Sequence, residues 1–193
     1  MNKIFCIPGR EETLPEFFEN FRLPNGVEIG GFEIIGQFSK LNFDKQINAV
    51  NNQITEHYWH KNNVLIGRSF GSWIILNSLL ALDKPFPGPV ILISSVLGHG
   101  GVHGFQFTAP GDKRFWNEVR KLTRPMAHKI MLIHAVDDEQ CPHELATKLA
   151  KNDAIKLFSM ESGGHSVGKT LSDLIFVETI LQLVENDNIN LVY

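Results

Sequence analysis

A short apolar run that ends in a Gly-x-Ser-x-Gly pentapeptide constrains the fold of this chain more than any other stretch. The run spans residues 64–71 (VLIGRSFG), and a second apolar segment follows from Trp73 to Leu82. We interpret the first part as a buried strand and the second as a helix, with Ser69 on the sharp turn between them. Glycines flank the serine because a Cβ there would strike the neighbouring strand or helix. The hydroxyl of Ser69 is therefore expected to stand clear of a sheet, beside a helix N-terminus.

Composition limits the classes of protein that this chain can belong to. With 193 residues, 43% of them hydrophobic, the chain can bury one core, so we expect a single domain over 1–193. A net charge of -3 without a long Lys/Arg run argues against binding to nucleic acid or to a membrane surface. No run approaches the roughly 20 apolar residues of a membrane span, and nothing indicates an oligomeric state.

The two cysteines, Cys6 and Cys141, provide neither a disulfide framework nor a pair spaced for zinc. The N-terminal stretch meets Pro8-Gly9 too early for a signal peptide and is interpreted as the first buried strand. These features favour a cytoplasmic protein.

Strands and amphipathic helices alternate along the chain. Further strands are expected at Phe32–Ile35, Val64–Gly67, Val90–Ser94, Lys129–Ala135 and Ala154–Met160. Helices are expected at Glu12–Arg22, from Asp44 to about Tyr58, at Trp73–Leu82, His143–Lys151 and Lys169–Glu185, and Lys84–Pro89 should act as a stop. Six such units predict a three-layer α/β/α fold with a mostly parallel six-stranded sheet, whose ligands bind beyond the carboxyl ends of the strands.

The segment from Val96 to Pro125 departs from this alternation. It is long and rich in glycine, and it contains a short amphipathic piece with Phe115, Trp116, Val119 and Leu122. We interpret it as a loop and small cap inserted over the sheet. Its aromatic residues could line an apolar acyl pocket or could pack the cap onto the sheet; they are Phe105, Phe107, Phe115 and Trp116. His99 and His103 are spaced like metal ligands, but the surrounding glycines disfavour the required helix, so a solvated loop is preferred.

A serine hydroxyl becomes a nucleophile only when a base removes its proton and a third group orients that base. Candidates for both follow predicted strands: Asp137 and Asp138 in one loop, and His165 in the next. His134 at the end of a strand is interpreted as structural. The order of the three groups along the chain is serine, acid, histidine.

With these residues the chain resembles the α/β-hydrolase superfamily over nearly its whole length, as a minimal, single-domain member. The resemblance identifies Ser69 as the nucleophile, His165 as the base and Asp138, rather than Asp137, as the acid, because the family's acid loop places its aspartate four residues before a proline, here Pro142.

The resemblance also implies an oxyanion hole formed by two backbone N–H groups. One would come from Phe70 in the elbow and the other from Arg10 in the loop after the first strand, with Glu11 as the alternative donor.

The resemblance implies a serine hydrolase that cleaves a small-molecule ester or thioester with a small-to-medium acyl group, without a metal or another cofactor. The alternative is a non-catalytic binding protein that keeps the fold. Residues 163–170 (GGHSVGKT) match a phosphate-binding P-loop, which we interpret as coincidence because too little chain follows for a magnesium-binding strand. Arg68 could meet an anionic substrate group or pair with an acid of the protein.

Overall fold

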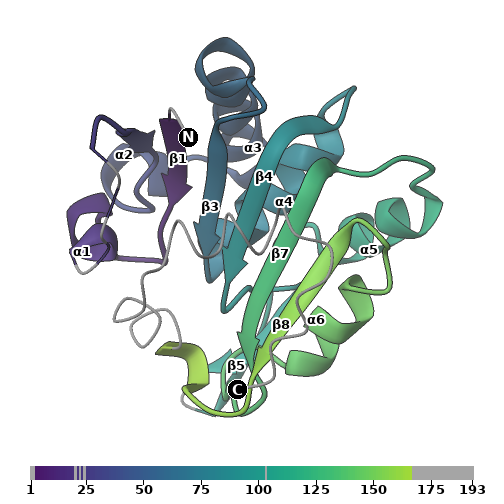
Figure 1. Cartoon of the computed structure of the whole chain (residues 1–193). Coiled ribbons are helices and arrows are strands. Elements are labelled where there is room, and N and C mark those ends of the chain that lie inside the picture. The colour runs from purple at the N-terminus through teal and green to yellow at the C-terminus, as the bar shows by residue number, and fades with distance from the viewer. Residues whose placement is uncertain (1–2, 20, 22, 24, 103, 167–193) are drawn as a thin grey trace.

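The computed structural model describes residues 3–19, 21, 23, 25–102 and 104–166 (Figure 1). Six strands form one sheet in the order β2-β1-β3-β4-β7-β8, and all neighbours in it are parallel. These strands are β1 (Lys3–Ile7), β2 (Glu28–Gly31), β3 (Val64–Arg68), β4 (Phe86–Ile93), β7 (Ala127–Ala135) and β8 (Ile155–Met160). The predicted parallel sheet and α/β architecture are thus confirmed.

Helices connect the strands, and local sequence explains where the clearest of them begin. The α-helices are α1 (Leu14–Phe18), α2 (Gly36–Lys40), α3 (Phe43–Gln53), α4 (Phe70–Ala81), α5 (Asp112–Lys121) and α6 (His143–Leu149). Thr13 and Glu16 form a capping box at α1, and the Asn42 side chain accepts the Lys45 N–H at the start of α3. A π-helical turn, Ile54–Tyr58, continues α3. None of the described helices is long and apolar enough to cross a bilayer.

The sheet buries apolar side chains on both faces. One face packs against α3, α4, α5 and α6, around the fully buried Trp73. The other face packs against α1 and the loop that follows it, with Phe17 at the centre of the contact. Figure 1 shows α3 and α4 behind the sheet. The helix predicted at 169–185 lies outside the described residues.

The prediction of the second strand at Phe32–Ile35 is wrong, because the strand is β2 at Glu28–Gly31. Its two glycines are required by close packing: a Cβ on Gly31 would lie 1.8 Å from the Cys6 carbonyl oxygen, and one on Gly30 would lie 2.3 Å from Tyr58 Oη. A glycine pair that looks like an interruption in the sequence is therefore what allows the strand to pair with β1.

Other predicted boundaries also need correction. Helix α1 ends at Phe18 rather than Arg22, and the short α2 was not expected. Strand β4 begins at Phe86, inside the predicted stop, because a register irregularity between Phe86 and Pro89 accommodates the prolines.

The predicted cap segment contains a helix at the expected amphipathic piece and, in addition, a hairpin that the sequence did not indicate. It holds α5 and an antiparallel hairpin of β5 (His99–Val102) and β6 (Phe105–Thr108). The expected solvated loop at His99 is thus wrong, although this residue is exposed, and His103 lies outside the described residues.

Candidate active site

Ser69 occupies a strained turn between β3 and α4. Its backbone has φ 51° and ψ −120°, which is an unusual conformation for a residue with a side chain. The turn is fixed from both sides, because the Ser69 N–H donates to the Ile93 carbonyl at 2.9 Å and its carbonyl accepts the Val96 N–H at 3.1 Å. Strain at a residue held this firmly is typical of functional positions.

The glycines on either side of Ser69 sit where no side chain fits. A Cβ on Gly67 would lie 2.7 Å from the Cα of Ser72, and one on Gly71 would lie 2.0 Å from the Ile7 carbonyl oxygen. Helix α4 therefore approaches β3 and β1 closely, and Ser69 lies at the turn where β3 ends and α4 begins.

The structure brings together the three side chains that the sequence singled out. His165 follows β8 in a 3₁₀ turn (Gly164–Ser166), and its Nε2 lies 2.9 Å from Ser69 Oγ. Its Nδ1 lies 3.0 Å from Asp138 Oδ2 and 3.2 Å from Oδ1. The Asp138 side chain is fully buried, whereas that of His165 is 12% exposed. An Nδ1–H donated to the carboxylate leaves Nε2 free to accept the serine proton.

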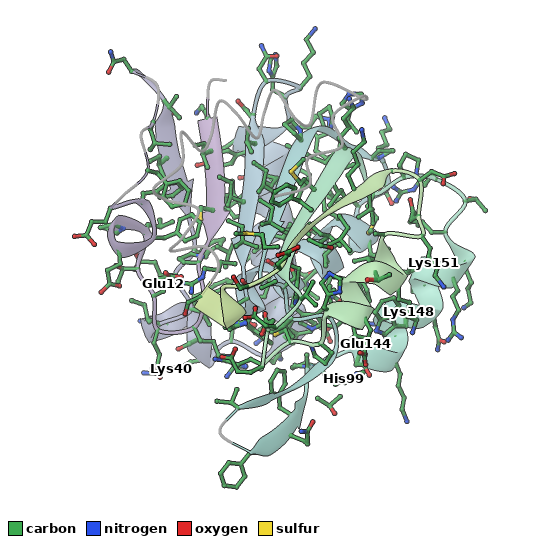
Figure 2. All side chains as sticks on the ribbon, turned by 60° about the horizontal axis from the view of Figure 1, so that its bottom comes forward. Glu12, Lys40, His99, Glu144, Lys148 and Lys151 are labelled. Atoms are coloured by element: carbon green, nitrogen blue, oxygen red, sulfur yellow. The ribbon has the colours of Figure 1, made fainter. Side chains whose placement is uncertain are left out.

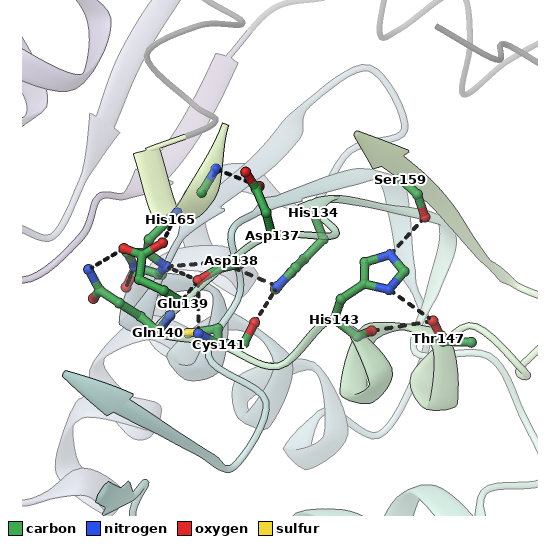
Figure 3. A network of polar contacts seen from close by, with 12 residues as sticks. His134, Asp137, Asp138, Glu139, Gln140, Cys141, His143, Thr147, Ser159 and His165 are labelled. Atoms are coloured by element: carbon green, nitrogen blue, oxygen red, sulfur yellow. Dashed lines mark hydrogen bonds and ion pairs between the residues drawn. The ribbon is translucent and has the colours of Figure 1, made fainter. Parts of the chain in front are cut away.

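Backbone groups fix the Asp138 carboxylate. Its Oδ1 accepts the N–H groups of Gln140 at 2.9 Å and Cys141 at 2.8 Å (Figure 3). Burial acts to raise the pKa of Asp138, but the hydrogen bond and charge of His165 and the Cys141 and Gln140 N–H groups outweigh it, and the pKa is lowered. The carboxylate is therefore ionised at neutral pH.

A second histidine, His134, also contacts the Asp138 carboxylate. Its Nε2 lies 2.8 Å from the Cys141 carbonyl oxygen and 3.3 Å from Asp138 Oδ2, so this nitrogen carries the proton and donates to both. Burial lowers the pKa of His134, because desolvation opposes its charged form. The structural role expected for this residue agrees with these contacts, but the sequence did not indicate its contact with Asp138.

The Asp137 carboxylate bonds the backbone of the loop that carries His165. It accepts the N–H groups of Gly163 at 3.3 Å and Gly164 at 2.8 Å. The His165 N–H donates to Glu139 at 3.3 Å. The first three N–H groups of the P-loop-like run are thus directed at carboxylates, which would repel a phosphate. Residues 167–170 of the run lie outside the described residues.

A cavity of about 1060 Å³ opens beside Ser69 and His165. Figure 2 looks toward this end of the molecule, where the strands end and where Glu12 and His99 lie. The loop after β1 lines one side of the cavity (Gly9, Arg10, Glu11, Glu12), and the hairpin lines another (Val102, Phe105, Phe107).

The aromatic residues of the cap segment divide into two groups. Phe105 and Phe107 line the cavity, and Phe105 is 79% exposed. Phe115 is fully buried against Trp73, with ring centroids 4.6 Å apart, and Trp116 packs beside it. The pocket interpretation therefore suits the hairpin, and the packing interpretation suits α5.

Both residues expected to form the oxyanion hole, Phe70 and Arg10, border the same cavity as Ser69. Phe70 is the first residue of α4, so its N–H is one of those in the first helical turn that have no intrahelical acceptor. The Arg10 guanidinium lies 4.2 Å from the centre of the Phe70 ring, and a Cβ on Gly71 would lie 2.5 Å from the Pro8 carbonyl oxygen, so the loop after β1 passes close to the start of α4. Glu11 adopts φ 61° in the tight loop that follows Gly9.

One cluster of side chains in the described part of the chain has the composition of a metal site. Ligand atoms of Asp138, Cys141 and His165 lie within 4.8 Å of one another. Hydrogen bonds already occupy the Asp138 carboxylate and both ring nitrogens of His165.

No protein-family model and no curated protein sequence matches this chain. Solved structures do match it along nearly all its length. An α/β-hydrolase domain-containing protein 10 from mouse superposes with a TM-score of 0.65 at 15% identity, covering 95% of this chain and 89% of that one. Est1E from Butyrivibrio proteoclasticus gives a TM-score of 0.62 at 13% identity, covering 95% and 88%. A thioesterase domain from the curacin biosynthetic pathway gives 0.63 at 11% identity, covering 95% and 91%. The chain thus has the α/β-hydrolase fold.

Proposed function

We propose that the chain is a serine hydrolase that cleaves the ester or thioester bond of a small molecule with a small-to-medium acyl group. The hydrogen-bonded chain from Ser69 through His165 to the buried Asp138, beside a cavity, carries the proposal. Hydrolase and esterase names among the structural neighbours support it. The two buried free cysteines are compatible with a cytoplasmic protein.

In the first half-reaction, His165 Nε2 takes the proton from Ser69 Oγ as the oxygen attacks the substrate carbonyl carbon. The carbonyl oxygen becomes an oxyanion, which accepts hydrogen bonds from the backbone N–H groups of Phe70 and Arg10. Asp138 stabilises the imidazolium. The protonated His165 then gives its proton to the leaving alcohol or thiol, and the acyl group stays on Ser69.

In the second half-reaction, water replaces the leaving group. His165 accepts a proton from the water as its oxygen attacks the acyl carbon, and the resulting tetrahedral intermediate again uses the two backbone N–H groups. Return of the proton to Ser69 Oγ releases the carboxylic acid. No group beyond the chain's own residues and water takes part in these steps.

The proposal is tested with p-nitrophenyl esters from acetate to laurate and with the matching acyl thioesters. We expect hydrolysis by the wild-type protein and a loss of at least about 10³-fold in kcat for Ser69→Ala. A Ser72→Ala variant is the matched control, because Ser72 is a buried serine of α4 whose Oγ has no partner among the described residues. Rates for wild type and Ser69→Ala that both equal the rate in buffer would support the non-catalytic alternative, and equal rates above it would contradict the role of Ser69.

A further inference from the structure

An ion pair between Glu12 and Arg68 joins the loop after β1 to the residue that precedes Ser69. The two side chains are 17% and 12% exposed, so the pair is mostly removed from water at the wall of the cavity. Nε of Arg68 is buried without an acceptor among the described residues. The Glu12 carboxylate is therefore the partner that holds this guanidinium in place.

The same carboxylate also closes the loop on itself. Glu12 Oε2 accepts the Gly9 N–H at 2.9 Å, and the Glu12 N–H donates to the Gly9 carbonyl at 3.3 Å. Between these residues Glu11 adopts φ 61°, a conformation that costs an L-residue about 1 kcal/mol. The bonds of Glu12 hold the backbone in a turn that it would not adopt readily by itself.

The position of the loop relative to Ser69 gives this pair its significance. A Cβ on Gly9 would lie 3.8 Å from Ser69 Cβ and 3.2 Å from Glu12 Oε2, so the loop runs directly beside the serine. Arg68 is the last residue of β3 and is bonded covalently to Ser69. The ion pair thus links the two backbone segments that carry the expected oxyanion donors.

We propose that Glu12 and Arg68 are positioning residues that hold the loop from Gly9 to Glu12 at the distance from Ser69 that the oxyanion requires. This inference rests on the proposed hydrolase function. In this arrangement the charge of Arg68 pairs with an acid of the protein, and not with an anionic group of the substrate. A mostly buried ion pair suits this task, because removing one partner leaves an uncompensated charge.

The test uses Glu12→Gln, which keeps the length of the side chain and an acceptor for Gly9 but removes the charge. Because displaced donors weaken transition-state binding more than substrate binding, we expect kcat to fall at least about tenfold with KM changed less than about twofold. The affinity for a boronic acid, which mimics the tetrahedral intermediate, should fall by the same factor as kcat/KM.

Arg68→Met should reproduce these losses. Because the two residues act as a unit, kcat of the Glu12→Gln/Arg68→Met double variant should be less than about twofold below that of the less active single variant. Arg68→Lys is a second, milder variant should Arg68→Met fail to fold. Glu28→Gln, which breaks the exposed Lys3–Glu28 pair on β1 and β2 away from the cavity, is the control and should retain wild-type kcat.

An active wild-type protein whose Glu12→Gln variant keeps kcat and boronic acid affinity would overturn the positioning role alone. A rise in KM confined to anionic esters in Arg68→Met would also overturn it, because Arg68 would then bind substrate. A wild-type protein that neither hydrolyses an ester nor binds the boronic acid would overturn both proposals.

Discussion

Asp137 and Asp138 are adjacent in the sequence but accept different hydrogen bonds. The Asp138 carboxylate accepts a hydrogen bond from His165 Nδ1 at 3.0 Å. The Asp137 carboxylate instead accepts hydrogen bonds from two backbone N–H groups of the loop that carries His165. Of the two carboxylates, that of Asp138 lies where it could stabilise an imidazolium at His165, whereas that of Asp137 bonds the backbone of the loop.

Substitution of the two aspartates by asparagine should separate these tasks. Asp138→Asn should lower kcat by on the order of 10³- to 10⁴-fold, because an amide in place of the carboxylate favours the wrong tautomer of His165. Asp137→Asn should cost less than about tenfold, since its amide oxygen can still accept from Gly164. Steady-state kinetics on one ester measures both, and a larger loss in Asp137→Asn would contradict the assignment.

The buried His134 makes stability depend on pH. Burial lowers its pKa below 6.5, so between 6.5 and the folded-state value the unfolded chain binds a proton that the folded chain does not. The free energy of unfolding should therefore decrease as pH falls below 6.5. Urea unfolding should show a shallower decrease for His134→Gln than for wild type in that window, and parallel curves would contradict a neutral His134.

At the scale of elements, the glycine of the elbow that faces β1 is a strict requirement. Gly71→Ala would place a methyl group 2.0 Å from a backbone oxygen of Ile7, and a backbone atom cannot rotate away. We expect a loss of about 2 kcal/mol or more in the free energy of unfolding. Gly101→Ala in the hairpin is the control, because its Cβ would lie 3.1 Å from the flexible Gln106 side chain and at an ordinary contact distance of 3.6 Å from the Phe105 carbonyl oxygen.

The hairpin and α5 should respond differently to loss of an aromatic ring. Phe105→Ala removes an exposed ring from the cavity wall, so kcat/KM should fall by about fivefold for long-chain esters and stay unchanged for acetate. Phe115→Ala removes a fully buried ring and should cost about 3–5 kcal/mol of unfolding free energy. An acyl-chain series and thermal melts distinguish the two, and chain-length effects confined to Phe115→Ala would reverse the assignment.

Sequence patterns predict elements well where burial alone decides them. The apolar run at Val64 and the one at Val90 correspond to central strands that are buried on both faces. Sequence patterns fail where a contact between residues distant in the sequence determines where an element forms. Strand β2 depends on the space that Cys6 and Tyr58 leave for two glycines, and the hairpin depends on pairing within a glycine-rich segment.

At the scale of the whole molecule, the parallel sheet explains why residues far apart in sequence can form one site. Ser69 and His165 are 96 positions apart, yet each follows a strand that ends at the same edge of the sheet (Figure 1). The order of the three groups could be predicted from the sequence because this topology fixes where strand ends lie. The Glu12–Arg68 pair could not, because no motif marks it and it appears only when β1 and β3 are placed side by side.

We propose that Ser69 is an activated nucleophile, and covalent labelling by a fluorophosphonate tests this role without knowledge of the substrate. We expect one phosphonyl group per chain, located on Ser69 by peptide mass spectrometry, with labelling abolished in Ser69→Ala and strongly slowed in His165→Ala. Folded wild-type protein that stays unlabelled, or a label on another residue, would contradict it.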